Sequence, residues 1–537
     1  MRPLLELVNT TVLIFGSGNK RAKLALRRIR VNVSLPTATA IVISAAISMA
    51  QSEHNEVNPT DQPAPANAEA PVSSAPKFDL SGLIKSRVAD KDDLFAEKIN
   101  PKFIQVLKTI GFNRNYVRGE GSHLWDADGN RYLDLLSGYG MFNMGRNHPV
   151  IKQAIRDYLD INDPWKLQMG SSLLPALLAE KLLTYAPHLD KVQFANSGAE
   201  CNEAALKFAR CSTGRERIIY CERAFHGLTY GSLSLNGCDS FRTGFQTMLP
   251  GPVSIPLNDL DALERELKAH PTAAFFVEPV QGKGVHRADD EFLLGAQELC
   301  RKHGALLVLD EVQCGMGRTG KMFAYQHIEG LEPDMILVSK SLSGGMVPVG
   351  AVMYRDQTYK KVFSSLDRCV VHSSTFCQGG LAMTCGLAAF HVIESEGLIE
   401  KGARQSERLL NGLRAMIAKY ELLHEVRGTG MMIGIELGSP KSLGLKSAWK
   451  LIHAADKGLF PQALIMPLLD KHRIITQVAG HNMDVIKLLP PLTMTDEDTD
   501  WFLSAFEDVL AECHKFPGPA WTTATHLLKF AATGKRS

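Results

Sequence analysis

The sequence lacks both a strong excess of charge and any pair of closely spaced cysteines. Its 59 basic and 57 acidic residues give a net charge of +2, so no broad electrostatic field would gather nucleic acid or an acidic surface. Ten cysteines are scattered along the 537 residues with no Cys-x-x-Cys pair, which argues against a zinc site and against a disulfide framework. We therefore expect free thiols in a reducing, cytoplasmic compartment, no bound metal ion and no nucleic-acid partner.

Acidic residues are also scarce in residues 1–50, where Glu6 is the only one. A cluster of lysines and arginines leads there into an uncharged run, 31–50, that ends in small residues. The segment could be a signal peptide cleaved after Ala50, a transit peptide, a membrane anchor, or untranslated upstream sequence with Met49 as the true start. We favour the last interpretation because the run is only weakly hydrophobic, and we expect no membrane association except through residues 31–50.

The rest of the chain divides by composition. Residues 51–76 are rich in Pro, Ala, Asn and Glu and should form a disordered linker, since they can bury little apolar surface. With 45% hydrophobic and 22% charged residues overall, the chain can bury a large core. We expect a small domain whose N-terminal part is residues 77–150 and whose C-terminal part is residues 401–513. A large domain at 151–400 separates these parts, and a tail follows at 514–537.

Short apolar runs alternate with amphipathic helical stretches between residues 150 and 400. This alternation predicts an α/β fold with a mostly parallel central sheet that is covered by helices. Farther along, a long helix at 400–423, strands near 431–437 and 485–489, and a closing helix at 496–513 indicate a smaller α+β domain. The six runs expected to form strands of the central sheet are 191–197, 217–222, 273–279, 305–312, 334–341 and 349–355.

Three of these runs end in an ionisable residue, namely Glu278, Asp310 and Lys340. In an open parallel sheet, ligands bind at the carboxyl ends of the strands. A single charge at the end of a buried strand is more often a structural ion pair. Three charges that converge on one edge of a sheet make a functional site the better interpretation.

A phosphate cradle is predicted where a strand runs through Ser197, Gly198 and Ala199 into a long helix. Small side chains allow close backbone approach, and the first helical amides attract anions, although a plain helix cap would look the same. A buried lysine can supply a neutral amine to an aldehyde, and a carboxylate can keep a pyridine nitrogen protonated. Together with Lys340 and Asp310, the cradle therefore predicts a pyridoxal-phosphate site.

At these residues the sequence resembles the class III aminotransferases of the ornithine, acetylornithine and putrescine type, within the fold type I group of pyridoxal-phosphate enzymes. Matching motifs run from the segment that begins at His123 to Leu489-PPLTMT, and the most specific are Leu309-DEVQCGMGRTGK and Ser339-KSLSGG. The resemblance implies a small domain built from both chain ends. It also implies a homodimer with its active site at the subunit interface.

The resemblance implies roles at the matched positions. Lys340 resembles the lysine that forms the Schiff base and moves the proton, Asp310 the partner of the pyridine nitrogen, and Glu278 the acid beside lysine and substrate. The remaining matches are cofactor contacts, and Thr375 among them resembles a phosphate ligand donated by the neighbouring subunit. These cofactor-binding positions are Ser197, Gly198, Ala199, Phe225, His226, Val312, Gln313 and Thr375.

Departures from the family bear on the substrate, whose predicted contacts are Tyr139, Leu228, Lys283 and Arg427. Leu228 stands where ornithine-type enzymes have an arginine that clamps the α-carboxylate, so that clamp is absent. Lys283 stands where relatives have a glutamate that masks an arginine. Arg427 is then expected to be unmasked and to bind a keto-acid carboxylate, or alternatively only to brace the small domain.

Two further interpretations remain open from the sequence. An apolar run that begins at Leu459 could line a hydrophobic substrate channel or could be extra core. For the function, we predict ping-pong transamination between an amine or ω-amino compound and a keto acid, with 2-oxoglutarate or pyruvate expected, through a Lys340 Schiff base. The alternatives are another reaction of the same cofactor, such as an aminomutase or decarboxylase step, and a non-catalytic scaffold.

Overall fold

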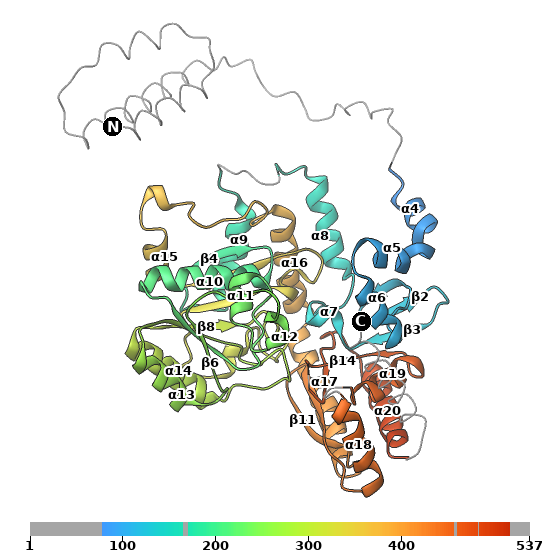
Figure 1. Cartoon of the computed structure of the whole chain (residues 1–537). Helices are drawn as coiled ribbons and strands as arrows, with labels where there is room; N and C mark the ends of the chain where they lie inside the picture. Colours follow the sequence, from blue (N-terminus) through green and yellow to red (C-terminus); the bar gives the residue numbers. More distant parts are fainter. Residues whose placement is uncertain (1–77, 165–169, 456–458, 482, 516–537) are drawn as a thin grey trace, which may run out of the picture. The chain divides into compact units, whose positions relative to one another are not determined.

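The computed structural model describes residues 78–164, 170–455, 459–481 and 483–515 (Figure 1). The expectations for residues 1–76, including the membrane anchor, and for nearly all of the C-terminal tail lie outside the described residues. The chain splits into two compact units at Arg87 and Val88. The described part of the first unit is essentially helix α4 (Leu80–Arg87), none of whose residues is buried.

The second unit is organised around a seven-stranded sheet. Strand β10 is antiparallel to both of its neighbours, and the other pairs are parallel, so the predicted mostly parallel sheet is confirmed. All six predicted strands are present. In spatial order the strands are β4 (Lys191–Ala195), β10 (Gly350–Tyr354), β9 (Met335–Val338), β8 (Leu306–Asp310), β7 (Thr272–Val277), β5 (Arg217–Cys221) and β6 (Pro252–Ile255).

Strand β6 was not predicted. It has only four residues and begins with a proline, which lacks the N–H that a central strand would need to donate. The strand is at the edge of the sheet and pairs with β5 alone, where a proline is tolerated. Its short length left too little periodicity to recognise.

Helices cover both faces of this sheet, as the burial of β7 shows. Ala274 and Phe276 belong to the core under α10, while Phe275 and Val277 belong to the core under α14 and α16. All six residues of β7 are buried, which explains why it reads as a continuous apolar run rather than an alternating one. The covering helices are α10 (Gly198–Thr213), α13 (Leu260–Ala269), α14 (Asp290–His303) and α16 (Gly380–Ser395).

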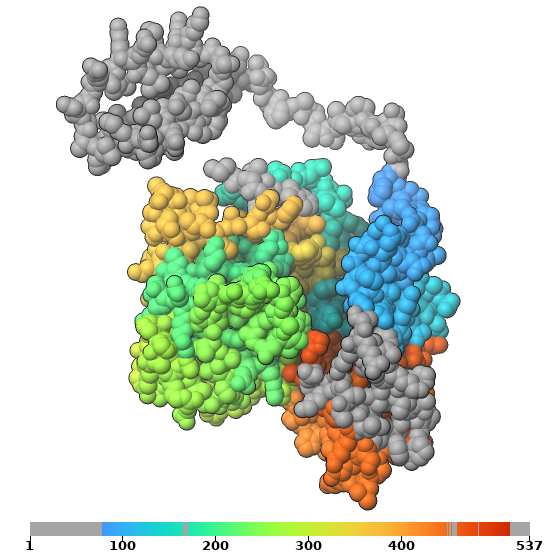
Figure 2. All heavy atoms as spheres, in the orientation of Figure 1, coloured from blue at the N-terminus to red at the C-terminus, as the bar shows by residue number. Residues whose placement is uncertain are grey.

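The smaller domain is built from both ends of the described chain. Its first sheet joins β3 to the late strand β13 in parallel, with Leu133 opposite Ile474. Figure 2 shows these N-terminal residues in blue gathered in one lobe with the C-terminal residues in orange and red. The two sheets comprise β1 (Tyr116–Glu120), β2 (His123–Asp126), β3 (Arg131–Asp134) and β13 (Ile474–Ile475), and then β11 (Leu423–Thr429), β12 (Met432–Leu437), β15 (Val485–Leu488) and β14 (Gln477–Val478).

The remaining elements connect these sheets and cover their surfaces. The closing helix α20 (Asp496–Cys513) has the predicted bounds, and Thr495 caps it by accepting a hydrogen bond from the Asp498 N–H. The others are η1 (Val88–Asp90), α5 (Lys91–Lys98), α6 (Pro101–Thr109), α7 (Ser137–Gly140), α8 (Pro149–Asp160), α9 (Leu173–Thr184), α11 (Tyr230–Ser234), α12 (Asp239–Arg242), η2 (Ala324–His327), η3 (Lys340–Ser343), α15 (Asp356–Val362), η4 (Leu366–Arg368), α17 (Leu398–Ile417), α18 (Leu443–Ala455) and α19 (Gln462–Asp470).

The helix expected at 400–423 is present as α17, but it ends at Ile417, and Leu423 already begins strand β11. Of the two interpretations of the apolar run after Leu459, extra core is the one that the structure shows, because helix α19 buries that run, including Leu464 and Leu468. Apolar residues that recur at helical spacing and pack against neighbouring helices are part of the hydrophobic core.

In the part of the chain that the structure describes, no helix has the length and apolar character to span a bilayer.

Candidate active site

The three predicted ionisable residues lie at one edge of the central sheet. Asp310 ends β8, Glu278 directly follows β7, and Lys340 follows β9 after a single intervening residue. These strands are adjacent in the sheet. Burial lowers the pKa of the Lys340 amine, and the charges of Asp310 and Glu278 oppose that shift. The structure therefore brings the three groups into one electrostatic cluster, as the strand ends predicted.

Lys340 has an unusual backbone conformation. Its φ of +44° lies in the left-handed region, which costs a residue with a side chain on the order of 1 kcal/mol. Hydroxyl groups on either side hold the segment, because Ser339 donates to the Val349 carbonyl at 2.6 Å and Ser341 to the Gly140 carbonyl at 2.9 Å. Backbone strain that is held in this way is typical of a functional position.

Asp310 is a buried carboxylate with three donors. Its Oδ2 atom accepts from Asn202 Nδ2 at 2.9 Å and from His226 Nδ1 at 2.8 Å, and Oδ1 accepts from the Val312 N–H at 3.0 Å. Burial favours the neutral form of His226, but the hydrogen bond and charge of Asp310 outweigh burial and raise the pKa of His226. Sequence reasoning missed Asn202, whose only signal was its place one turn after Gly198 on a buried helix face.

The predicted phosphate cradle is a tightly packed helix start. Ser197 caps α10 by accepting from the Glu200 N–H at 3.2 Å. A Cβ added to Gly198 would lie 2.7 Å from Val312 Cγ1, so a larger side chain would not fit there. A Cβ added to Gly227, the glycine that follows His226, would lie 2.7 Å from Ala199 Cβ. The predicted contacts Ser197, Gly198 and Ala199 therefore meet Val312 and a third segment at Gly227.

Glu278 holds the predicted stacking residue in place. Its Oε1 atom accepts from the Phe225 N–H at 2.9 Å, and Oε2 accepts from the Gly282 N–H at 2.7 Å. Burial raises the pKa of Glu278, which the charge of His226 and these backbone donors oppose and the charge of Asp310 reinforces. The carboxyl group is thus fixed beside the reactive lysine rather than free to rotate.

Gln313 links the site to the small domain. Its Nε2 atom donates to the Tyr139 carbonyl at 3.0 Å, and its Oε1 atom accepts from Lys487 Nζ at 3.4 Å. Lys487 also donates to the Gly282 carbonyl at 2.7 Å. Burial, reinforced by the charge of Lys340, lowers the pKa of Lys487 to about 7.

Sequence reasoning missed Lys487, although a signal existed. It interrupts the apolar strand β15, all of whose residues are buried. Like Lys340, Lys487 is a charged residue at a buried strand.

The predicted substrate contacts differ in their surroundings. Lys283 is buried, donates to Asn236 Oδ1 at 3.2 Å, and lies over the rings of Phe225 and Phe241 with its Nζ atom 5.2 Å and 4.3 Å from their centroids. Leu228 is 54% exposed and Tyr139 is 60% exposed. These two side chains are therefore open to solvent in the single chain, whereas Lys283 is part of the packed site.

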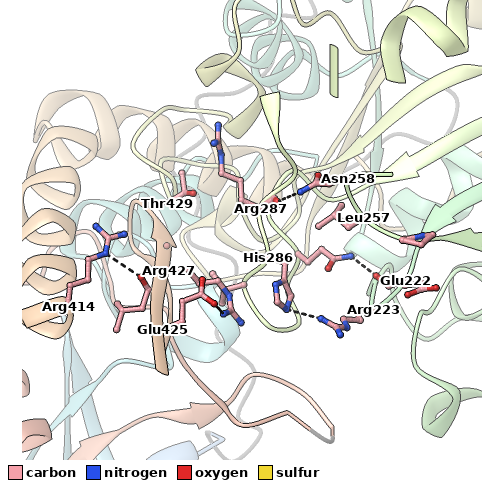
Figure 3. Close-up of a pocket in the computed structure, with 15 residues that line it drawn as sticks. Glu222, Arg223, Leu257, Asn258, His286, Arg287, Arg414, Glu425, Arg427 and Thr429 are labelled. Atoms are coloured by element: carbon pink, nitrogen blue, oxygen red, sulfur yellow. Dashed lines mark hydrogen bonds and ion pairs between the residues drawn. The ribbon is translucent and has the colours of Figure 1, made fainter. Parts of the chain in front are cut away.

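The expectation that Arg427 is unmasked is wrong (Figure 3). Its guanidinium pairs with Glu425 on its own strand and with Glu436 on the neighbouring strand β12, and donates twice to the Gly284 carbonyl. Arg427 lines a cavity of about 660 Å³ whose lining does not include Lys340, Asp310 or Glu278. These contacts fit the alternative role of bracing the small domain. The pairing with Glu436 depends on the sheet register, which the sequence did not reveal.

Thr375 lies on an exposed segment next to the cradle. Its neighbour Ser374 accepts a hydrogen bond from Asn196 Nδ2 at 2.8 Å, which anchors the segment beside the loop that precedes α10. Thr375 itself is exposed on this chain. That exposure is what a side chain needs if it serves the site of a second subunit.

With this geometry established, the comparisons with known proteins identify the family. The sequence pattern that defines the family described as Aminotransferase class-III matches residues 108–510. The chain belongs to the class III aminotransferases. It is 36% identical over 409 residues to an acetylornithine aminotransferase of Methanocaldococcus jannaschii, covering 74% of this chain and 94% of that protein. It is also 33% identical over 507 residues to the aminotransferase PigE of a Serratia species, covering 88% of this chain but only 58% of the length of PigE.

Solved structures agree with this assignment. An ornithine aminotransferase from Toxoplasma gondii matches with a TM-score of 0.67 and 28% identity, covering 79% of this chain and 98% of that one. A taurine:2-oxoglutarate aminotransferase from Bifidobacterium kashiwanohense, in complex with PLP and glutamate, matches with a TM-score of 0.67 and 27% identity, covering 74% and 92%. This class III aminotransferase is thus a pyridoxal-phosphate-dependent enzyme of fold type I.

The residues present fit that cofactor. Burial lowers the pKa of the Lys340 amine and so favours its neutral form, and Asp310 supplies a buried carboxylate at the end of the adjacent strand. The start of α10 at Gly198 offers backbone amides to a phosphate. An amine, a carboxylate and a helix N-terminus are the three groups that an aldehyde, a pyridine nitrogen and a phosphate require.

Proposed function

We propose that this class III aminotransferase transfers an amino group between an amine or ω-amino compound and a keto acid, 2-oxoglutarate or pyruvate, by a ping-pong mechanism. The observation that carries the proposal is the cluster of Lys340, Asp310 and Glu278 at one sheet edge. When bound, pyridoxal phosphate supplies an electron sink for the carbon that loses its proton. The chain supplies orientation and proton transfer.

Each residue of the cluster has a proposed task. Lys340 Nζ would hold the cofactor covalently and, once released, would carry the proton between substrate and cofactor, which its lowered pKa favours. Asp310, which Asn202 and His226 orient, would keep the pyridine nitrogen protonated. Phe225, Val312 and Gln313 would help to hold the ring.

The proposed donor lacks an α-amino-acid group, that is, a carboxylate on a carbon that also carries a nitrogen, such as ornithine and acetylornithine have. Leu228 offers no guanidinium at the position of the family's α-carboxylate clamp, and Arg427 is occupied by two glutamates. To test this, ornithine, acetylornithine, putrescine or a long-chain amine is added to the cofactor-loaded enzyme without a keto acid, and conversion of the cofactor is followed by its absorbance. A clear preference for either ornithine-type substrate would refute the proposed donor class.

We infer that two subunits share the site. Large apolar side chains next to Thr375 are exposed on the single chain, at 73% for Val370 and 72% for Phe376. Exposed apolar side chains that gather in one place indicate a protein interface. Mixing inactive Lys340→Ala and Thr375→Val subunits tests the inference. If Thr375 serves the partner's site, one site of each mixed dimer is intact and activity returns, and absence of any return argues against it.

Two alternatives are distinguished by simple measurements. Other chemistry on the same cofactor would show no dependence on a keto acid, whereas transamination gives parallel double-reciprocal lines. A scaffold would show no cofactor absorbance and no borohydride-trapped adduct on Lys340. We further propose a reducing, cytoplasmic setting, because buried cysteines of the described residues such as Cys201, Cys221 and Cys300 are free thiols. Intact-mass measurement of the native protein would define its N-terminus.

A further inference from the structure

Two lysines beside the cofactor site are buried without a counter-ion. Lys283 is 7% exposed and Lys487 is 5% exposed. Lys283 donates to the side-chain carbonyl of Asn236, while Lys487 donates to the Gly282 carbonyl and to Gln313 Oε1. All of these acceptors are neutral. Among the described residues, no carboxylate forms an ion pair with either ammonium group.

A buried ammonium group is costly unless an anion neutralises it. Burial lowers the pKa of both lysines, and the charge of Lys283 lowers the pKa of Lys487 further. The nearby carboxylate of Glu278 acts on both at longer range, but its oxygens are already bound by the N–H groups of Phe225 and Gly282. Within the described residues, each ammonium group therefore lacks a carboxylate in direct contact that would neutralise it.

The two lysines contact residues that are predicted to bind the cofactor. Lys487 hydrogen-bonds to Gln313, which is predicted to face the cofactor, and the charge of Lys340 acts on it. Lys283 lies over the ring of Phe225, which is predicted to stack on the cofactor. They come from different parts of the chain, a loop after β7 and strand β15 of the small domain, so the positive site forms only when the two domains meet.

We propose that Lys283 and Lys487 form a receptor for an anionic group at the end of the amino donor remote from its amine, so that the enzyme accepts ω-amino acids and rejects diamines. This inference rests on the proposed function and narrows its donor class. A carboxylate or sulfonate placed between the two ammonium groups would neutralise them. The second ammonium of a diamine would instead meet two like charges, which disfavours binding strongly.

Three four-carbon donors separate charge from size. 4-Aminobutyrate, butylamine and putrescine present an anionic, a neutral and a cationic end to the same site. With the cofactor-loaded full chain and no keto acid, we expect the apparent second-order rate constant of cofactor conversion to fall in that order. The difference between the first and the last should be at least about a hundredfold. Equal rates, or faster reaction of putrescine, would overturn the inference.

Charge reversal at Lys283 provides the sharper test. Lys283→Glu would pair with Lys487 and mask it, so the preference for 4-aminobutyrate over putrescine should fall at least about tenfold. Lys102→Glu, an exposed lysine on α6, makes the same change of charge away from the site and should leave the preference unaltered. Lys487→Gln should weaken the preference as well. Thermal melting establishes that each variant is folded.

Binding of butanoate gives a measurement that does not depend on turnover. Calorimetry should show that it binds to the loaded wild-type enzyme and at least about tenfold more weakly to Lys283→Glu. Equal binding to both proteins would overturn the inference even if transamination is observed. If no amine of any kind converts the cofactor, the proposed function fails, and butanoate binding alone then decides the inference.

Discussion

Replacing Lys487 with methionine tests the electrostatic account of the site through protein stability. Burial lowers the pKa of this lysine from 10.5 to about 7. A shift of one pKa unit corresponds to about 1.4 kcal/mol, so the buried ammonium destabilises the fold at neutral pH by roughly 4 kcal/mol. Methionine has similar length and no charge, and it therefore removes this penalty.

The substitution also removes favourable contacts. The Gly282 carbonyl and Gln313 Oε1 each lose a donor, at a cost of roughly 1 kcal/mol each. The net expectation at pH 7, without substrate, is that the free energy of unfolding rises by roughly 2 kcal/mol.

The stability difference between the Lys487→Met protein and the wild type should change sign with pH. Because the folded-state pKa is depressed, the unfolded chain binds more protons between pH 7 and pH 10.5, and the wild-type protein gains stability as pH rises through that range. Near pH 10 the ammonium penalty is nearly gone while the lost hydrogen bonds remain. The Lys487→Met protein should then be less stable than the wild type.

Thermal melting of the cofactor-free protein at pH 7 and pH 10 provides the assay. Lys108→Met, at an exposed lysine on α6, serves as a matched control that should change stability little at either pH. The reasoning would be refuted if the Lys487→Met protein melts below the wild type at pH 7, or if the sign of the difference in melting temperature is the same at pH 7 and pH 10. Either result would mean that Lys487 has a counter-ion or is hydrated in solution.

Three further predictions concern the cofactor site. Lys340→Ala should abolish turnover and the borohydride-trapped adduct while circular dichroism shows an intact fold; persistent activity would contradict the assigned role. Asp310→Asn should lower kcat/KM at least about a hundredfold. It should also lower the raised pKa of His226, measured by NMR titration, because burial would then act without the carboxylate; an unchanged pKa would contradict the pairing. Gly198→Ala should cost about 1–3 kcal/mol and weaken cofactor binding through contact with Val312, and a compensating Val312→Ala change should restore part of both.

The central sheet could be predicted from the sequence because its strands are buried on both faces. A run such as that of β7 has only apolar residues, and its end at Glu278 is marked by the first charge. The same reasoning placed Asp310 and Lys340 on one edge, since carboxyl ends of adjacent parallel strands meet there. Local pattern therefore determined the strands and the three charged residues that they present.

Other contacts were decided by tertiary structure alone. Asn202 binds Asp310 across 108 positions in the chain, and Lys487 reaches Gln313 from the other domain across 174. Arg427 is neutralised by Glu436 because antiparallel pairing brings β11 and β12 side by side. Pairing partners of a charge depend on sheet register and domain packing, which no local pattern encodes. The sequence thus predicted which residues carry the chemistry, whereas the three-dimensional structure decided which charged side chains are paired with one another.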